Sequence, residues 1–69
     1  MNKSDENRLK IRLLQHKIKT LYAHQEALEC LMEYYNHTSE FYSRLESEKY
    51  RITGLTLDAE IRLEILKSQ

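Results

Sequence analysis

Residues 11–35, IRLLQHKIKTLYAHQEALECLMEYY, decide the fold of this chain, because hydrophobic residues recur in this stretch at alternating steps of three and four. This spacing places them along one side of a helix. The positions in this register are Ile11, Leu14, Ile18, Leu21, Gln25, Leu28, Met32 and Tyr35, of which only Gln25 is strongly polar. A helix with such a continuous stripe needs another helix to cover it. The stretch therefore predicts coiled-coil-like packing of helices.

The length and composition favour one small all-α domain that spans residues 1–69. The chain has 69 residues, no proline and a single glycine, Gly54, so it lacks most of the residues that punctuate sheets and loops. Domains of this size bury only ~60% of their unfolded surface, and association with another chain commonly supplies the missing stability.

The pattern divides the chain into two helices and a short turn. We expect a first helix over about 5–35, capped by Ser4 or Asp5, and a turn at about 36–39. The second helix is expected over about 40–67, starting after Ser39, with a break at Gly54. Two segments of about equal length joined by a short turn are typical of an antiparallel helical hairpin.

Hydrophobic residues of the second segment occupy more than one side of the expected helix. One register contains Phe41, Leu45, Ile52, Leu55, Ala59, Leu63 and Leu66, with Glu48 and Arg62 at positions that would suit hydrophobic residues. Nearly opposite lie Tyr50, Leu57, Ile61 and Ile65. One partner helix cannot cover both sides, so we expect two hairpins to form a homodimeric four-helix bundle, or a client protein to cover the second side.

The oligomer interface predicted from these registers draws on both helices. It consists of Ile11, Leu14, Ile18, Leu21, Gln25, Leu28, Met32, Ile52, Leu55, Leu57, Ala59, Ile61, Leu63 and Ile65. Gln25 has two interpretations: a polar core residue that fixes the register and the number of partners, or a residue at the rim of the bundle.

Strict alternation of hydrophobic and polar residues from Leu55 to Ile65 is the one pattern that favours a strand. Leu9, Ile11 and Leu13 alternate in the same way, so a βααβ arrangement is the alternative fold. We favour helix at both places, because Leu, Ala, Glu, Arg and Lys dominate them and are strong helix formers.

The sequence contains no convincing catalytic, cofactor or metal motif. His16, His24, His37 and Cys30 do not have the paired spacing of a zinc site, and one glycine cannot make a phosphate-binding loop. We therefore expect no enzyme activity, no cofactor and no bound metal. A single cysteine, no apparent signal peptide and no long hydrophobic run lead us to expect a soluble cytoplasmic protein without a membrane partner.

Charge is balanced over the whole chain but unevenly distributed along it. Eleven Lys and Arg residues match eleven Asp and Glu residues, yet every charged residue between Asn7 and Gln25 is basic. Candidate nucleic-acid-binding residues are Arg8, Arg12, Lys17 and Lys19. The favoured interpretation is pairing across the hairpin, with this stretch beside Asp58, Glu60 and Glu64, and with Glu26, Glu29 and Glu33 beside Arg44, Lys49 and Arg51.

Aromatic residues gather around the expected turn and form the candidate surface for a protein client. They are Tyr34, Tyr35, Phe41 and Tyr42, and their simplest role is to close that end of the bundle. If some of them remain exposed, they can bind another protein. The sequence thus favours a small non-enzymatic interaction or regulatory protein that acts as a hairpin homodimer. The alternative is a small nucleic-acid-binding regulator that uses the basic side of the first helix.

Overall fold

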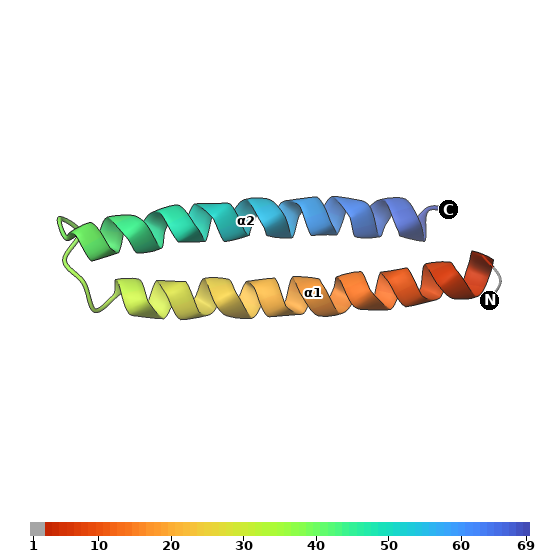
Figure 1. The fold of residues 1–69 in the computed structure, drawn as a ribbon, viewed down its shortest axis with the longest axis horizontal. Helices are drawn as coiled ribbons and strands as arrows, with labels where there is room; N and C mark the ends of the chain where they lie inside the picture. Colours follow the sequence, from red (N-terminus) through yellow and green to blue (C-terminus); the bar gives the residue numbers. More distant parts are fainter. Residues whose placement is uncertain (1–2) are drawn as a thin grey trace.

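The chain forms a rod-shaped hairpin of two helices. The computed structural model describes residues 3–69, in which α1 (Lys3–Met32) and α2 (Glu40–Lys67) lie side by side and are joined by a short turn (Figure 1). The Cα atoms extend over 53 × 14 × 14 Å. This confirms the expected all-α hairpin. Neither α1 nor α2 combines the length and the hydropathy that a membrane crossing needs.

Three polar contacts between the helices define their antiparallel alignment. Lys49 Nζ lies 3.3 Å from Glu29 Oε1, and Gln25 Nε2 donates a hydrogen bond of 2.8 Å to Thr56 Oγ1. Closer to the free ends, the hydroxyl of Tyr22 donates to Glu60 Oε1. Moving back along α1 therefore corresponds to moving forward along α2, as an antiparallel pair requires.

The side of α1 that packs against α2 is the one that the sequence predicts. Its positions are half-buried or buried at steps of three and four: Asn7, Ile11, Leu14, Ile18, Leu21, Gln25, Leu28 and Met32. Gln25 therefore lies within the packed surface and not outside it. Tyr35, the last position of the predicted stripe, lies beyond the helix and is exposed.

The packed side of α2 differs from the predicted register. The structure places Tyr42, Leu45, Lys49, Ile52, Thr56, Ala59, Leu63 and Leu66 toward α1. The assignment of Phe41 and Leu55 to this side was wrong, because both are exposed. The polar residues Lys49 and Thr56 occupy central positions and break the hydrophobic pattern, so the sequence pattern favoured the neighbouring hydrophobic residues instead.

The boundaries of α1 correct two expectations. The helix ends at Met32, three residues before the predicted end, because the amide groups of Tyr34 and Tyr35 donate to the carbonyls of Leu31 and Met32 in tighter turns. Capping by Ser4 or Asp5 was also wrong, since both lie inside the helix.

The start of α2 confirms the sequence analysis. The hydroxyl oxygen of Ser39 accepts a hydrogen bond of 3.1 Å from the amide of Phe41, so Ser39 is the N-cap residue. Before it, Asn36 Oδ1 accepts from both the amide and the hydroxyl of Thr38 and holds the turn together.

The second half of α2 is continuous helix, which overturns two further expectations. The predicted break at Gly54 was wrong, because α2 passes through it without a positive φ angle. The strand alternative for 55–65 was also wrong, as was the strand at 9–13, because both segments are helical. Strong helix propensity of the residues outweighs the period-two pattern there.

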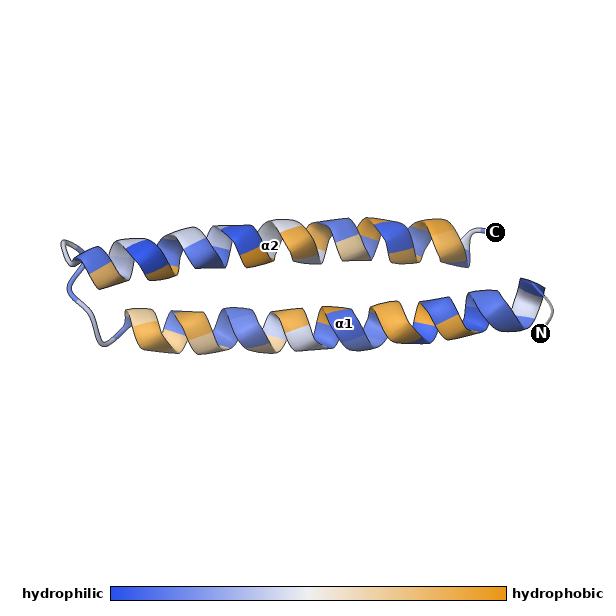
Figure 2. Cartoon of the chain, in the orientation of Figure 1, coloured by the Kyte–Doolittle hydropathy of each residue, from blue (hydrophilic) through white to orange (hydrophobic). Residues whose placement is uncertain are grey.

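The buried core of the hairpin is small. Its buried hydrophobic residues are Leu28, Ile52, Ala59 and Leu63. Thr56 is the buried polar residue: it accepts from Gln25 and its hydroxyl donates 2.8 Å to the carbonyl of Ile52. Hydrophobic residues are not restricted to the sides on which the two helices face each other (Figure 2). A single hairpin therefore leaves much of its hydrophobic surface in water.

Candidate functional site

The most prominent surface feature of the hairpin is its exposed hydrophobic residues. Within residues 3–69 these are Leu9, Leu13, Tyr22, Leu31, Tyr34, Tyr35, Phe41, Tyr50, Leu55, Leu57, Ile61 and Ile65. Contiguous exposed hydrophobic surface usually marks an interaction site. Most of them gather in three places, at the turn, at the free ends of the helices and along the outer side of α2, and Tyr22 and Leu55 lie outside these groups.

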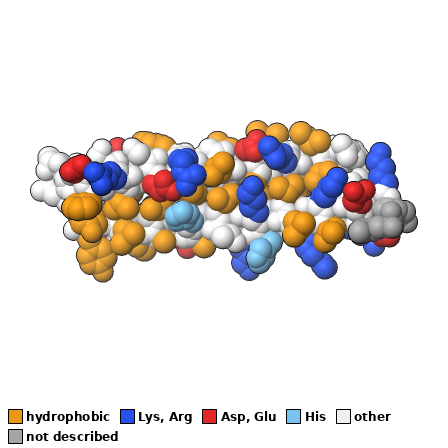
Figure 3. Space-filling view, viewed as in Figure 1, with side chains coloured by type: hydrophobic (Ala, Val, Ile, Leu, Met, Phe, Trp, Pro, Cys, Tyr) orange, Lys and Arg blue, Asp and Glu red, His pale blue; other side chains and the backbone are white. Residues whose placement is uncertain are grey.

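The aromatic residues predicted as a client-binding site divide between two sides of the turn. The rings of Tyr35 and Phe41 lie 5.6 Å apart between centroids, and with Leu31 and Leu45 they line a shallow hollow. Figure 3 shows hydrophobic side chains gathered at this end of the molecule. Tyr35 and Phe41 therefore form one exposed patch, as the sequence analysis allowed.

Tyr34 and Tyr42 do not join that patch. The ring of Tyr42 stacks on His37 at 4.6 Å between centroids and is half-buried toward α1, where it closes the end of the hairpin. Tyr34 is 86% exposed, the largest exposed fraction among the large hydrophobic residues described. Its ring thus has no cover within the described chain.

An open groove between the helices lies at their free ends. Leu13, Leu14, Ile65 and Leu66 form its hydrophobic lining, and Lys10 and Arg62 also line it. The neighbouring pairs Leu13–Leu14 and Ile65–Leu66 are visible in the sequence, but no local pattern predicts this groove. Their pairing across the hairpin depends on the alignment of the two helices.

The outer side of α2 carries a third group, formed by Tyr50, Leu57, Ile61 and Ile65. These four residues were expected opposite the packed side, and they are exposed there. Gly54 lies between Tyr50 and Leu57, and a Cβ atom at this glycine would meet nothing within 4 Å. The glycine is therefore not required for packing inside the hairpin.

The residues predicted as an oligomer interface occupy two different environments. Those on the packed sides, from Ile11 to Met32 on α1 together with Ile52, Ala59 and Leu63, lie between the two helices of one chain. Leu55, Leu57, Ile61 and Ile65 are exposed. Only this second set is free to contact another molecule without opening the hairpin.

The predicted nucleic-acid-binding residues are exposed but do not form one surface. Arg8 and Arg12 line the same shallow depression on α1. Lys17 and Lys19 are two residues apart, so they project from nearly opposite sides of the helix. Arg8, Arg12, Lys17 and Lys19 take part in no ion pair with any residue that the structure describes.

The expected pairing of charges across the hairpin is realised in one place. Glu29 pairs with Lys49, as predicted. Two of the three expected partners of the basic stretch have other contacts: Asp58 pairs with Arg62 of its own helix at 3.0 Å, and Glu60 accepts from Tyr22. The hydrogen bond to Glu60, desolvation and the nearby carboxylate charge all raise the pKa of Tyr22 above its ordinary value.

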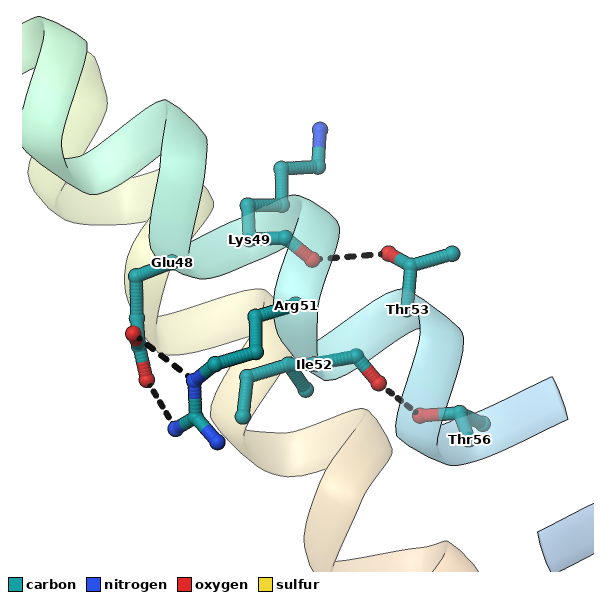
Figure 4. A network of polar contacts seen from close by, with 6 residues as sticks. All are labelled: Glu48, Lys49, Arg51, Ile52, Thr53 and Thr56. Carbon is teal, nitrogen blue, oxygen red and sulfur yellow. Dashed lines mark hydrogen bonds and ion pairs between the residues drawn. The ribbon is translucent and has the colours of Figure 1, made fainter. Parts of the chain in front are cut away.

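Charged residues of α2 are mostly paired along the helix itself. Arg51 Nε donates 3.1 Å to Glu48 Oε2, next to the backbone contacts of Lys49 with Thr53 and of Ile52 with Thr56 (Figure 4). The hydrogen bond from Arg51 lowers the pKa of Glu48 below its ordinary value. The Glu48–Arg51 pair is exposed, and all of these contacts are i,i+3 or i,i+4 spaced, so they stabilise the helix and do not form a reactive centre.

Comparison with known proteins provides no functional assignment. No family model matches this chain, and no match is found among curated proteins or among solved structures. Within residues 3–69 there is no group of three His, Cys, Asp or Glu side chains that could hold a metal ion.

Proposed function

We propose that this protein is a small non-enzymatic interaction protein that acts as a homodimer of helical hairpins. The observation that carries the proposal is the imbalance between buried and exposed hydrophobic residues. Four hydrophobic residues are buried, whereas twelve large hydrophobic residues of the described chain are exposed. Full burial of one such side chain is worth about 1.5–3 kcal/mol, so association of two hairpins offers a large stabilisation.

In the proposed dimer, four helices pack together and the hydrophobic surface that stays outside binds a protein client. The patch of Tyr35 and Phe41 and the outer side of α2 are the two candidate client surfaces. Aromatic residues are enriched in protein interfaces because they combine a large hydrophobic body with a polar edge or tip. The proposed location of this protein is the cytoplasm.

The test is the molar mass in solution, measured by light scattering from micromolar to millimolar concentration. The chain has a mass of 8.3 kDa, so the proposal predicts twice this value at the higher concentrations. A mass of 8.3 kDa throughout would contradict the homodimer, and failure of a hydrophobic dye to bind would contradict a free client surface. Dye binding would show that hydrophobic surface remains free for a client.

A second candidate function is nucleic-acid binding by the basic half of α1. It is favoured by one observation, namely that Arg8, Arg12, Lys17 and Lys19 have no ion-pair partner among the residues described. If these residues contact phosphates, affinity for duplex DNA or RNA falls steeply as salt rises. Binding that survives moderate salt and disappears in a variant with Arg8, Arg12 and Lys19 replaced by Gln would favour this function over the first.

A further inference from the structure

A second regular stripe runs along α1 on the side away from α2, and near the free ends one of its residues, Leu13, also borders the groove between the helices. The stripe consists of Leu9, Leu13, His16, Thr20, Ala23, Ala27 and Cys30, which recur at alternating steps of four and three. We call these seven residues the outer stripe. All of them are exposed, and none is an acidic residue, a lysine or an arginine. The stripe therefore has the spacing of a helix-packing surface, although nothing in the described chain covers it.

One flank of the outer stripe carries four charged residues with an ordered change of sign. Arg12, Lys19, Glu26 and Glu33 are spaced by seven residues, so they project from the same side of α1. The amide of Glu33 still donates to the carbonyl of Glu29, so the helical path continues to this position. The order along the helix is two positive residues followed by two negative residues.

This order is complementary to itself when a second copy of α1 runs in the opposite direction. Reversing the helix brings Arg12 of one copy beside Glu33 of the other, and Lys19 beside Glu26. A two-fold axis near residues 22 and 23 repeats both pairs, as a closed symmetric dimer requires. In a parallel, aligned pair each charge would instead meet a charge of the same sign, which is destabilising.

The outer stripe itself fits the same antiparallel arrangement. The small residues Thr20 and Ala23 meet at the centre, where they permit a close approach of the two helices. Toward the ends, Leu13 lies beside Cys30 of the second copy, and Leu9 lies near Tyr34. This contact would cover the ring of Tyr34, which is 86% exposed in the single hairpin.

The outer side of α2 is less suited to this role, because four of the charged residues on this helix already pair with each other. Arg51 pairs with Glu48, and Asp58 pairs with Arg62. Arg12, Lys19, Glu26 and Glu33, in contrast, form no side-chain hydrogen bond or ion pair with the residues described. Helix α1 therefore differs from α2 in two ways. These four charged residues have no such partner in the described part of the chain and are complementary to those of a second copy, and the uncharged outer stripe lies beside them.

We infer that the homodimer forms by antiparallel contact of the outer stripe of α1 with the same stripe of a second copy. The inference rests on the proposed homodimer and specifies its interface and direction. The four helices then lie in the order α2, α1, α1 of the second copy, α2 of the second copy, with the outer side of each α2 left free for a client. This layered arrangement replaces the closed four-helix bundle expected from the sequence as the proposed form of the dimer.

The native cysteine provides a direct test of direction. In the proposed dimer the Cys30 residues of the two copies lie far apart, whereas in a parallel aligned dimer they would be adjacent. A Leu13→Cys substitution in the otherwise native chain brings the new thiol beside Cys30 of the second copy. The two cysteines of one chain are 17 residues apart on α1, about 25 Å, so they cannot react with each other.

The expected result with a short bifunctional thiol cross-linker is a covalent dimer for Leu13→Cys and none for the native chain. Leu57→Cys is the matched control, because it replaces another exposed leucine but on α2, and it should not cross-link to Cys30. Cross-linking of the native chain through Cys30, or efficient cross-linking of Leu57→Cys alone, would overturn the inference while leaving the homodimer intact. A monomeric native chain would overturn both proposals.

Charge reversal provides an independent test of the same interface. The variant Arg12→Glu/Lys19→Glu makes the flank entirely acidic and should weaken dimerisation about tenfold or more, because four pairs are replaced by repulsion. Adding Glu26→Lys/Glu33→Lys restores opposite signs in reversed order and should restore the dimer. Circular dichroism checks that each variant stays helical. If the quadruple variant dimerises no better than the double variant Arg12→Glu/Lys19→Glu, the inference is contradicted.

Discussion

The contact between Gln25 and Thr56 allows the most specific prediction about the stability of the hairpin. Gln25 Nε2 donates 2.8 Å to Thr56 Oγ1, and Thr56 is only 2% exposed, so this hydrogen bond lies within the packed surface. A hydrogen bond of this kind contributes about 1 kcal/mol net. The loss of one partner should therefore have a different effect from the loss of both.

Thr56→Val keeps the shape of the side chain but removes the acceptor for Gln25 and the donor to the carbonyl of Ile52. We expect it to lower the free energy of unfolding by about 1 kcal/mol, because a half-buried amide loses its partner. Gln25→Leu also loses the bond but gains hydrophobic burial of about 1.5 kcal/mol, so its net effect is an increase of about 0.5 kcal/mol. Its melting temperature should rise slightly.

The double variant Gln25→Leu/Thr56→Val should be more stable than the native chain by about 0.5 kcal/mol, because the hydrogen bond is lost only once and the leucine still adds hydrophobic burial. The two single effects then fail to add by about 1 kcal/mol. Urea unfolding followed by circular dichroism, at one fixed protein concentration, measures all four members of this cycle. Effects that add to within about 0.3 kcal/mol would refute direct contact between the two side chains.

Three further predictions concern single residues. Gly54→Ala should raise the free energy of unfolding by about 1 kcal/mol, because a Cβ atom there meets nothing within 4 Å and alanine is the better helix former. If chemical denaturation instead shows a lower free energy of unfolding, the glycine has a packing role. Ser39→Ala should lower it by about 1 kcal/mol through loss of the bond to the amide of Phe41, whereas Ser39→Asp should retain most of the stability in the same assay. The pKa of Tyr22 is raised in the folded chain, so its hydrogen bond to Glu60 stabilises the fold below the ordinary pKa of 10.0, and this stabilisation is lost as pH rises through the higher pKa. In thermal melts, alkaline pH should therefore lower the melting temperature of the native chain more than that of Tyr22→Phe.

Helix content and the packed side of α1 could be predicted from the sequence, because both depend on local properties. Steps of three and four place Ile11 to Met32 on one side of a helix whatever surrounds it. The Ser39 cap is equally local, since its hydroxyl bonds to an amide two residues away. The end of α1 was predicted three residues too late because Glu33, Tyr34 and Tyr35 are compatible with helix, and only the tight turn bonds of the last two end it.

The register of α2 could not be predicted in the same way, because it depends on what lies opposite. Lys49 and Thr56 occupy packed positions since Glu29 and Gln25 lie there to meet them. From the sequence alone, Phe41 and Leu55 were the more reasonable choices for that side. The candidate surfaces behave likewise: the composition shows an excess of hydrophobic residues, but their division into separate groups follows from the alignment of the two helices.

The sequence by itself determined that this chain forms two helices and that one side of the first must be covered, because helix propensity and periodicity act within a few residues. Only the tertiary structure decided which polar residues share the packed surface, which charges remain without partners and which hydrophobic residues stay in water. Those features arise from contacts between residues about 20 to 38 positions apart, such as Glu29 with Lys49 and Tyr22 with Glu60. No local pattern in the sequence encodes a pairing across that separation.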